Sequence, residues 1–274
     1  MSVKISELPV LAPGDVAAGD AVAIVDASEG VTKQVDLSGV MSSGFRNAII
    51  NGNFAVNQRG ASGAVTLSAG DYGHDRWKAG ASGCTYTFAT SANVTTLTIA
   101  AGSLVQVIEG ASLFSGTYTL SFTGTAQGKI GAGSFGDSGI TGSVTGGTNL
   151  NIEFGTGTVS QVQLEAGSVA TPFERRPVGT ELALCQRYYY SPTSAISLRI
   201  ATTTASVQPL NSGFIAFPVT MRGAPVASVT FDDGLNIGTP SASITAEGVR
   251  FSCDSGGTGY ATYIANFFSA DAEL

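Results

Sequence analysis

The chain has 274 residues, of which 12% are charged and 43% hydrophobic, and its formal net charge is −7. This composition excludes intrinsic disorder, which requires low hydrophobicity together with high net charge. The acidic balance excludes nucleic acid as a partner, because phosphate binding requires a clustered basic surface. No apolar run approaches the roughly 20 residues that span a bilayer, so we expect no membrane insertion.

The first 44 residues predict a β-hairpin that is too small to hold a core of its own. Two short apolar runs, 21–25 and 31–37, flank the polar spacer 26–30. A lone hairpin is only marginally stable, so we expect this segment to pack on another protein. Residues 41–44 predict a flexible joint after it. The N-terminus lacks the apolar stretch of a signal peptide, which predicts synthesis and assembly in the cytoplasm.

Residues 45–176 contain short runs of alternating polarity, each bounded by Gly, Ser, Asn or Asp. Period-two patterning with turn signals between the runs predicts a β-sandwich of the jelly-roll type. The glycine-dense stretch 124–147 predicts loops and short edge strands. The predicted strands are 85–88, 96–99, 103–108, 117–122, 149–154 and 159–164.

Residues 177–274 begin with the one convincing helix signal. Pro177 ends the preceding strand, and Thr180 is expected to cap a helix over 181–188. The β-pattern then returns at 196–200, 213–218, 227–231, 249–253 and 260–268. The predicted class is therefore all-β, with a small N-terminal anchor, a central sandwich, a short helix and a C-terminal β-domain.

An ordered set of short motifs runs along the chain: Ile5–Pro9, Asn47–Phe54, Asn57–Gly60, Asp75–Trp77, Gln161–Gly167, Ala170–Arg176, Gly179–Leu182, Cys185–Tyr189, Phe217–Arg222 and Ala224–Pro225. This set resembles the bacteriophage tail-fibre and spike proteins that carry a jelly roll similar to carbohydrate-binding modules. The motifs span nearly the whole chain in the family's order, which makes the set specific for the family but not for a receptor.

The resemblance implies a subunit of a virion appendage that attaches the particle to surface polysaccharide of the host cell. Residues 1–44 would join other virion proteins, and the chain would form a homotrimer. Few charges support such assembly, because obligate interfaces are depleted of charge. Two alternatives remain open: a connector that carries a separate receptor-binding protein, and a spike mounted on the capsid.

The inventory of catalytic and metal-binding residues is small, and it predicts no cofactor, no metal site and no enzyme activity. His74 is the only histidine, so no site with several His ligands can form, and no Gly-x-Ser-x-Gly motif accompanies it. The three cysteines are far apart and are interpreted as small buried hydrophobes. Loop Asp and Asn oxygens leave a structural Ca²⁺ open, although no fixed calcium motif is present.

A glycan hydrolase needs only two carboxylates and is the least favoured of the alternatives. These carboxylates have structural rather than catalytic interpretations: Asp75 is expected to form an ion pair with Arg76, and others lie in sequences typical of turns. The long repeats of β-helical depolymerases are absent. The candidate carboxylates are Asp71, Asp75, Glu109, Asp137, Glu153, Asp232, Asp233 and Asp254.

Receptor contact is predicted at loops, where binding residues concentrate on rigid β-scaffolds. The polar turns 231–236 and 254–260 supply Asp232, Asp233 and Asn236 as acceptors for sugar hydroxyls and Tyr260 as a stacking face. Ordinary hairpin turns would have the same composition. Trp77 is predicted to anchor the core, and residues 188–190 are predicted to seal a domain or subunit contact.

Overall fold

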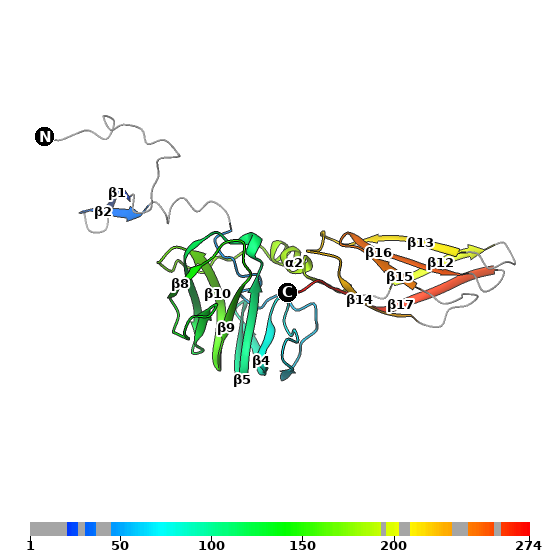
Figure 1. Ribbon diagram of the computed structural model, residues 1–274, viewed down its shortest axis with the longest axis horizontal. Helices are drawn as coiled ribbons and strands as arrows, with labels where there is room; N and C mark the ends of the chain where they lie inside the picture. The colour runs from blue at the N-terminus through cyan, green and yellow to red at the C-terminus, as the bar shows by residue number, and fades with distance from the viewer. Residues whose placement is uncertain are drawn as a thin grey trace, which may run out of the picture.

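The computed structural model describes residues 21–26, 31–36, 45–192, 196–202, 209–231, 241–254 and 259–274. The predicted all-β class is confirmed, because 47% of the chain lies in strands and the helical structure is short. The predicted N-terminal hairpin is also present: β1 (Ala21–Asp26) pairs antiparallel with β2 (Val31–Asp36). Figure 1 shows the order of the elements along the chain.

The central region, residues 45–176, is built on an eight-stranded antiparallel sheet that branches at one strand. The order is β3-β4-β5-β10-β6-β8, while β9 pairs with β5 and β7 pairs with β9. Its strands are β3 (Val65–Leu67), β4 (Lys78–Ser91), β5 (Val94–Ile108), β6 (Gly116–Gly124), β7 (Gly128–Ile130), β8 (Ile140–Val144), β9 (Leu150–Phe154) and β10 (Gly157–Ala166).

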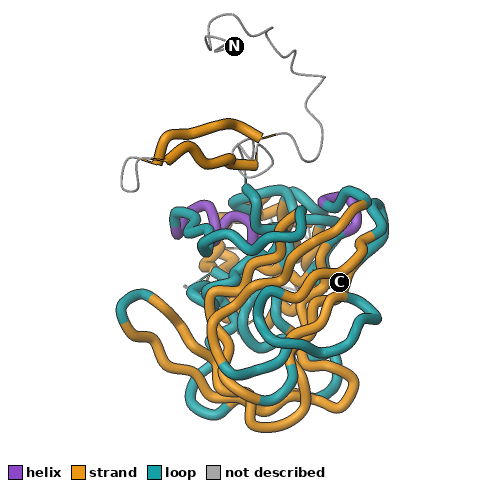
Figure 2. The backbone as a smooth tube through the Cα atoms, turned by 90° about the vertical axis from the view of Figure 1, so that its left-hand side faces the viewer, coloured by secondary structure: helices purple, strands orange, loops and turns teal. Residues whose placement is uncertain are grey.

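The two branches of this sheet face each other across one core. The first half of β5 pairs with β10, and its second half pairs with β9. Phe122 on β6 and Phe154 on β9 are not on neighbouring strands, yet their rings meet edge to face with centroids 5.0 Å apart. Figure 2 shows the strands curving around this shared interior. Side chains from both branches thus form the layered core that the alternating pattern predicted.

The two predicted strands 96–99 and 103–108 form one continuous strand, β5. The glycine between them permits this. Gly102 has a φ of +72°, and a Cβ placed on it would lie 2.0 Å from the main-chain oxygen of Gly83 on β4. The sequence therefore indicated a turn at a point where the structure has a bulge, because glycine serves both.

The segment that leads into β3 lies along β10, beside another bulge. Gln161 has a φ of 50°, and the pairing of β10 with β6 shifts between Ser160 and Gln163. The amide of Val162 donates to the main-chain oxygen of Gly52 at 2.8 Å instead. The bulge therefore frees the backbone of β10 to bind the segment that contains Gly52.

The helix α2 (Val178–Gln186) begins earlier than the sequence predicted. Pro177 occupies the cap position without a side-chain hydrogen bond, so Thr180 is not the cap. The main-chain oxygen of Pro177 already accepts the first helical hydrogen bond, from Glu181 at 3.1 Å. Proline has no N–H to leave without a partner, so it is tolerated at the start of a helix, which permits the earlier start.

Beyond α2, two smaller sheets pack on each other and confirm the predicted C-terminal strands. Their shared core contains Val249 and Phe251 from β16 and Ala270 from β17. One sheet has the order β11-β17-β12 with β14 also on β17, and the other has the order β13-β16-β15. The strands are β11 (Tyr189–Tyr190), β12 (Ile196–Thr202), β13 (Pro209–Ala216), β14 (Val226–Phe231), β15 (Ser241–Ile244), β16 (Gly248–Asp254) and β17 (Gly259–Asp271).

Candidate functional site

The Asp75–Trp77 motif is buried throughout and organises the central core. Trp77 is fully buried, its Nε1 donates to the main-chain oxygen of Asn51 at 3.0 Å, and its ring packs on Phe54 with centroids 5.0 Å apart. The prediction that Trp77 is a core residue is confirmed. A ring without exposed surface has no face on which a sugar could stack.

The expected ion pair between Asp75 and Arg76 is wrong. Asp75 accepts hydrogen bonds from the main-chain nitrogen of Gln58 at 2.6 Å and from its Nε2 at 2.7 Å. Burial raises the pKa of Asp75 against these hydrogen bonds. Arg76 has a left-handed φ of 72°, and its guanidinium binds the carboxylate of Glu273 and the main-chain oxygen of Val107. Adjacency in the sequence therefore did not identify the ionic partner.

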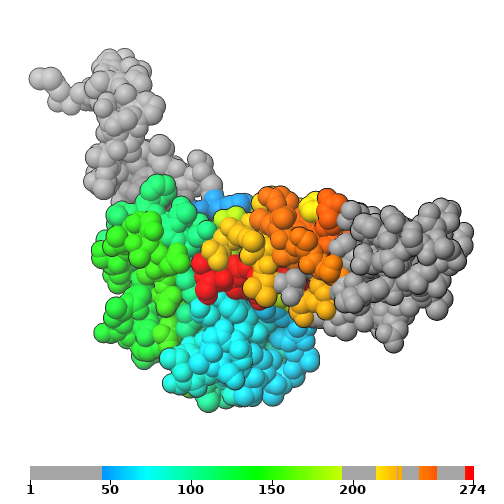
Figure 3. Space-filling model, turned by 45° about the vertical axis from the view of Figure 1, so that its right-hand side comes forward, coloured from blue at the N-terminus to red at the C-terminus, as the bar shows by residue number. Residues whose placement is uncertain are grey.

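The last residues of the chain are bound to the central region by two arginines. Glu273 is 4% exposed at its side chain and pairs with Arg76 and, at 3.3 Å, with Arg59. Burial raises the pKa of Glu273, an effect that Arg76 and Arg59 oppose. Arg59 also pairs with Asp271 at 3.1 Å. Figure 3 shows these C-terminal residues in red, between the central region and the C-terminal sheets.

Two further donors from the central region bind the main-chain oxygen of Leu274. The hydroxyl of Tyr72 donates at 2.7 Å and Nζ of Lys78 donates at 2.6 Å. We call the contact of Arg59, Tyr72, Arg76 and Lys78 with residues 271–274 the C-terminal clasp. It joins segments about 200 residues apart in the sequence, as the pairing of Tyr72 with Leu274 illustrates.

Tyrosines 188 and 189 complete the junction between the two regions. The guanidinium of Arg76 lies 3.5 Å from the centroid of the Tyr188 ring, and that of Arg59 lies 3.7 Å from the Tyr189 ring. The hydroxyl of Tyr188 donates to Glu109 at 2.9 Å. The predicted role of this segment in a domain contact is therefore observed. Such cation–π contacts are strongest where water is excluded.

His74 is a core residue rather than a catalytic base. It is 1% exposed, and its Nδ1 lies 2.9 Å from the hydroxyl of Tyr86. Burial lowers the pKa of His74 to about 4, so the ring is neutral near pH 7. Among the described residues, no three His, Cys, Asp or Glu side chains gather to hold a metal ion.

The candidate carboxylates of the central region have structural partners. Glu109 pairs with Arg187 at 3.1 Å, and Glu153 pairs with Lys129 at 2.8 Å. Asp71 accepts from the main-chain nitrogen of Ser68, and the exposed Asp137 accepts from Gln127 at 3.4 Å. Asp254 ends β16, and its side chain lies outside the described part of the chain. Ion pairs and turns thus account for the carboxylates that the structure describes.

The predicted receptor residues fall largely outside the structure. Asp232, Asp233 and Asn236 are not among the described residues, and Tyr260 lies in β17 with its side chain not described. The ends of the strands that flank these residues are described. β17 begins at Gly259, which pairs with Thr202, whereas its far end pairs with Tyr189 at the clasp. The predicted turn 254–260 therefore adjoins a strand end remote from the central region, whereas Phe231, where the predicted turn 231–236 begins, pairs with Ala265 in the middle of β17.

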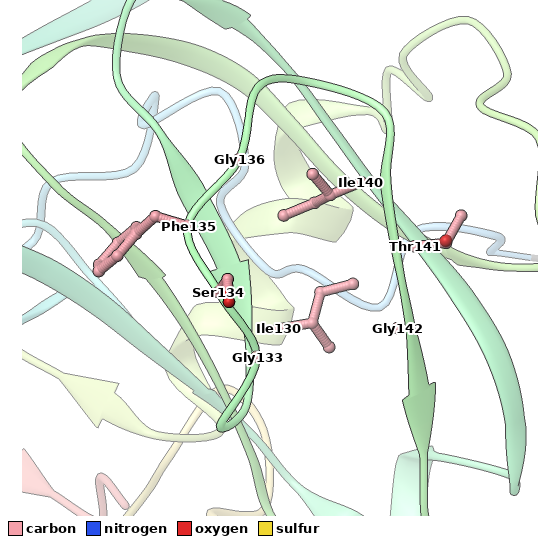
Figure 4. Close-up of a pocket in the computed structure, with 8 residues that line it drawn as sticks. All are labelled: Ile130, Gly133, Ser134, Phe135, Gly136, Ile140, Thr141 and Gly142. Carbon is pink, nitrogen blue, oxygen red and sulfur yellow. The ribbon is translucent and has the colours of Figure 1, made fainter.

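Two hollows lie on the central region, and the sequence did not single out either one. The first, of about 320 Å³, lies among the glycine-rich loops and is lined by uncharged residues that include Ile130, Phe135 and Ile140 (Figure 4). The second, of about 400 Å³, lies between the segments 47–56 and 173–181 and the β4–β5 turn, and polar, charged and apolar side chains all line it. Ligand pockets commonly start at about 300 Å³.

The described cysteines are buried and unpaired, as predicted: Cys84 and Cys185 are both free thiols. Burial raises the pKa of Cys84 to about 11 and raises that of Cys185 as well. Cys253 lies in β16, and its side chain is not described. Within the described ranges, no helix is long and apolar enough to cross a membrane.

Comparisons with known proteins return no relative. No family model matches the chain, and neither the curated proteins nor the solved structures contain a match.

Proposed function

We propose that this chain is a non-catalytic subunit of a virion appendage, a tail fibre or spike, that attaches the particle to polysaccharide of the host-cell surface. The observation that carries the proposal is the clasp. Both the start of the C-terminal sheets at Tyr189 and their end at Asp271 are fixed to the central region. The strands between them extend away from it as an arm (Figure 1).

The dimensions of the arm suit the display of a binding surface. β17 has 13 residues, which at about 3.3 Å per residue span about 40 Å. Its start at Gly259 adjoins the turn predicted to contact the receptor. A buried junction with two arginines and two stacked tyrosines resists bending at the base of the arm. An attachment protein needs such stiffness to transmit load from receptor to particle.

Assembly into a homotrimer is part of the proposal. Several large apolar side chains on the described surface are exposed, and contact with other copies would cover them. These are Phe45, Phe114, Phe135, Val169, Val178, Phe214 and Val226. Repeated weak sites would then give tight attachment, because avidity can exceed single-site affinity by about 10²–10⁴. Sedimentation should show a trimer, and a stable folded monomer at micromolar concentration would contradict this part.

The test of receptor contact replaces Asp232, Asp233 and Asn236 by Ala together. We expect purified wild-type protein to compete with intact particles for host cells, and the triple variant to compete poorly. A matched control replaces the exposed Asp137 and Asn151 on the central region by Ala and should compete like wild type.

Each outcome of this test bears on a named alternative. Undiminished competition by the triple variant would remove this turn as the contact. Competition by neither protein, together with capture of a second virion protein at the arm, would favour the connector. Reducing sugar released from host polysaccharide by wild type, and lost in a carboxylate variant, would show a hydrolase. Tracing the chain in intact particles would separate tail from capsid placement.

A further inference from the structure

The strand β8 is a free edge of the central sheet. Its residues, Ile140–Val144, pair with β6, and β8 has no other partner in the described sheets. Figure 1 shows β8 on the side of the central region opposite the arm. The edge is therefore a separate place from the clasp and from the predicted receptor turns.

Two residues of β8 turn their main-chain groups toward this free edge. The amide of Gly167, just after β10, donates to the main-chain oxygen of Thr117 on β6 at 2.8 Å, so Thr117 directs its main-chain groups toward β10. Ser143 lies opposite Thr117, so the main-chain groups of Ser143 are not bonded to β6. Thr141, opposite Thr119, is in the same position two residues earlier. Both residues therefore present N–H and C=O groups that a further strand can bind.

β8 lacks the features that protect most edge strands. Natural sheets shield their edges with very short strands, charged side chains or prolines. The other two end strands of the central sheet follow this rule, because β3 and β7 have three residues each and β7 carries Lys129. β8 has five residues, none of them charged and none a proline. Such an edge is a template for strand addition.

Apolar surface borders this edge at both ends. At the start of β8 lies the uncharged hollow of about 320 Å³, where the side chains of Ile130 and Ile140 lie between β7 and β8 (Figure 4). Phe135, which also lines this hollow, is 44% exposed. At the other end, a Cβ on Gly146 would lie 3.0 Å from the main-chain carbon of Phe114, whose residue is 83% exposed. Exposed aromatic rings beside a free edge are typical of a contact surface.

The charge of the protein indicates which partner covers this surface. The net charge is −7, so two copies repel each other unless they meet through uncharged surface. Neither β8 nor the lining of the hollow contains a charged residue, and the exposed Asp137 lies in the loop before them. Lys129, whose Nζ lies 4.7 Å from the Phe135 ring, is neutralised by Glu153 at 2.8 Å. A basic partner gains no attraction here, whereas a second copy meets no like charge.

We propose that β8 is the contact surface for a second copy of this chain, which lays an extended segment along Thr141 and Ser143 and seats an apolar side chain in the hollow beside Ile140. Main-chain hydrogen bonds give strand addition its affinity, and a pocket for one side chain fixes its register. In a ring of three copies, each β8 meets a different surface of the next copy. The identity of the partner rests on the proposed homotrimer, whereas the location rests on the free edge and its apolar surroundings.

The first test places a charge on the edge. Thr141 is exposed, and Thr141→Lys should weaken association in sedimentation at least about tenfold, because a lysine on an edge opposes strand addition. The matched control is Thr98→Lys, at an exposed threonine of the inner strand β5, which should associate like wild type. Ser143→Pro removes an outward amide that β6 does not use and should weaken association as Thr141→Lys does. Thermal unfolding by circular dichroism confirms that each variant is folded.

The second test observes the edge amides themselves. Hydrogen exchange of the purified 274-residue chain, followed by mass spectrometry over a range of protein concentrations, should slow in residues 140–144 as the chain assembles. Exchange in the inner strand β5 should not depend on concentration. Equal association of wild type and Thr141→Lys, or exchange of residues 140–144 that is independent of concentration, would overturn the inference.

The outcomes separate this inference from the proposed function. If wild type and Thr141→Lys are both trimers, the contact surface is wrong and the homotrimer stands. If wild type forms a dimer that Thr141→Lys disrupts, the β8 contact stands and the trimer is wrong. A wild-type monomer at micromolar concentration would overturn both, while competition with particles for host cells tests attachment independently of either.

Discussion

The carboxylate of Glu273 is paired with the guanidinium of Arg76, 197 residues earlier in the chain, and both side chains are almost completely buried. The pair lies at the point where the C-terminal sheets return to the central region. This ion pair fixes the base of the arm, so the last residues of the chain hold the C-terminal sheets to the central region.

Replacing Glu273 by Gln should destabilise the protein strongly. The variant leaves Arg76 buried without a compensating charge, and breaking such a pair typically costs about 3–5 kcal/mol. Guanidinium unfolding followed by circular dichroism measures the loss. Glu247→Gln, at an exposed glutamate, is the control and should change the free energy of unfolding by less than about 0.5 kcal/mol. Equal stability of the two variants would show that the clasp does not hold the regions together.

The stability of the protein should fall as the pH is lowered from 6.5 to 4 because of His74. Burial lowers the pKa of His74 in the folded state to about 4, from 6.5 when exposed. In this window the unfolded chain binds a proton that the folded chain does not bind. The loss from this residue reaches about 3 kcal/mol at the lower end, at 1.36 kcal/mol per pH unit.

Chemical unfolding at a series of pH values tests this, with His74→Gln as the comparison. The variant lacks the titrating imidazole ring, while the carboxylates of the chain, which also titrate in this range, are the same in both proteins. The free energy of unfolding should therefore decline less steeply for the variant between pH 6.5 and 5. Parallel plots of the free energy of unfolding against pH for the two proteins would contradict the conclusion that His74 is buried and neutral.

The elements of the fold could be predicted from the sequence, but the contacts between distant segments could not. Period-two patterns located β6 and β9 closely, because alternating side chains report burial on one face. The partner of Arg76 was misassigned, since no local pattern reports a residue 197 positions away. The hollow lined by the segments 47–56 and 173–181 was missed for the same reason, because only folding brings together segments more than 100 residues apart.

Gly52→Ala should destabilise the central region. A Cβ at this position would lie 2.2 Å from the main-chain oxygen of Val162, at the bulge of β10. Forcing these backbones apart should cost about 1–3 kcal/mol. The control is Gly179→Ala in α2, where nothing lies within 4 Å of the added atom. That variant should gain up to about 1 kcal/mol from helix propensity. Thermal unfolding measures both, and a stable Gly52→Ala protein would refute the close approach.

Removal of residues 1–44 should leave thermal unfolding of the remainder nearly unchanged. Among the residues whose burial is described, the central core begins with Ala48 and Ile49, which follow the segment removed. The proposed anchoring role predicts that the truncated chain is absent from assembled particles. Particles that carry the truncated chain at the normal level would refute the anchor assignment.

Attachment without catalysis is measured directly by adsorption of intact particles to host cells in the presence of the purified 274-residue chain, with release of reducing sugar followed in the same samples. We expect the purified chain to lower adsorption in a saturable manner, isolated surface polysaccharide to reverse this effect, and no reducing sugar to appear. Adsorption unaffected by saturating chain would contradict attachment, and sugar released by the chain would contradict the absence of catalysis.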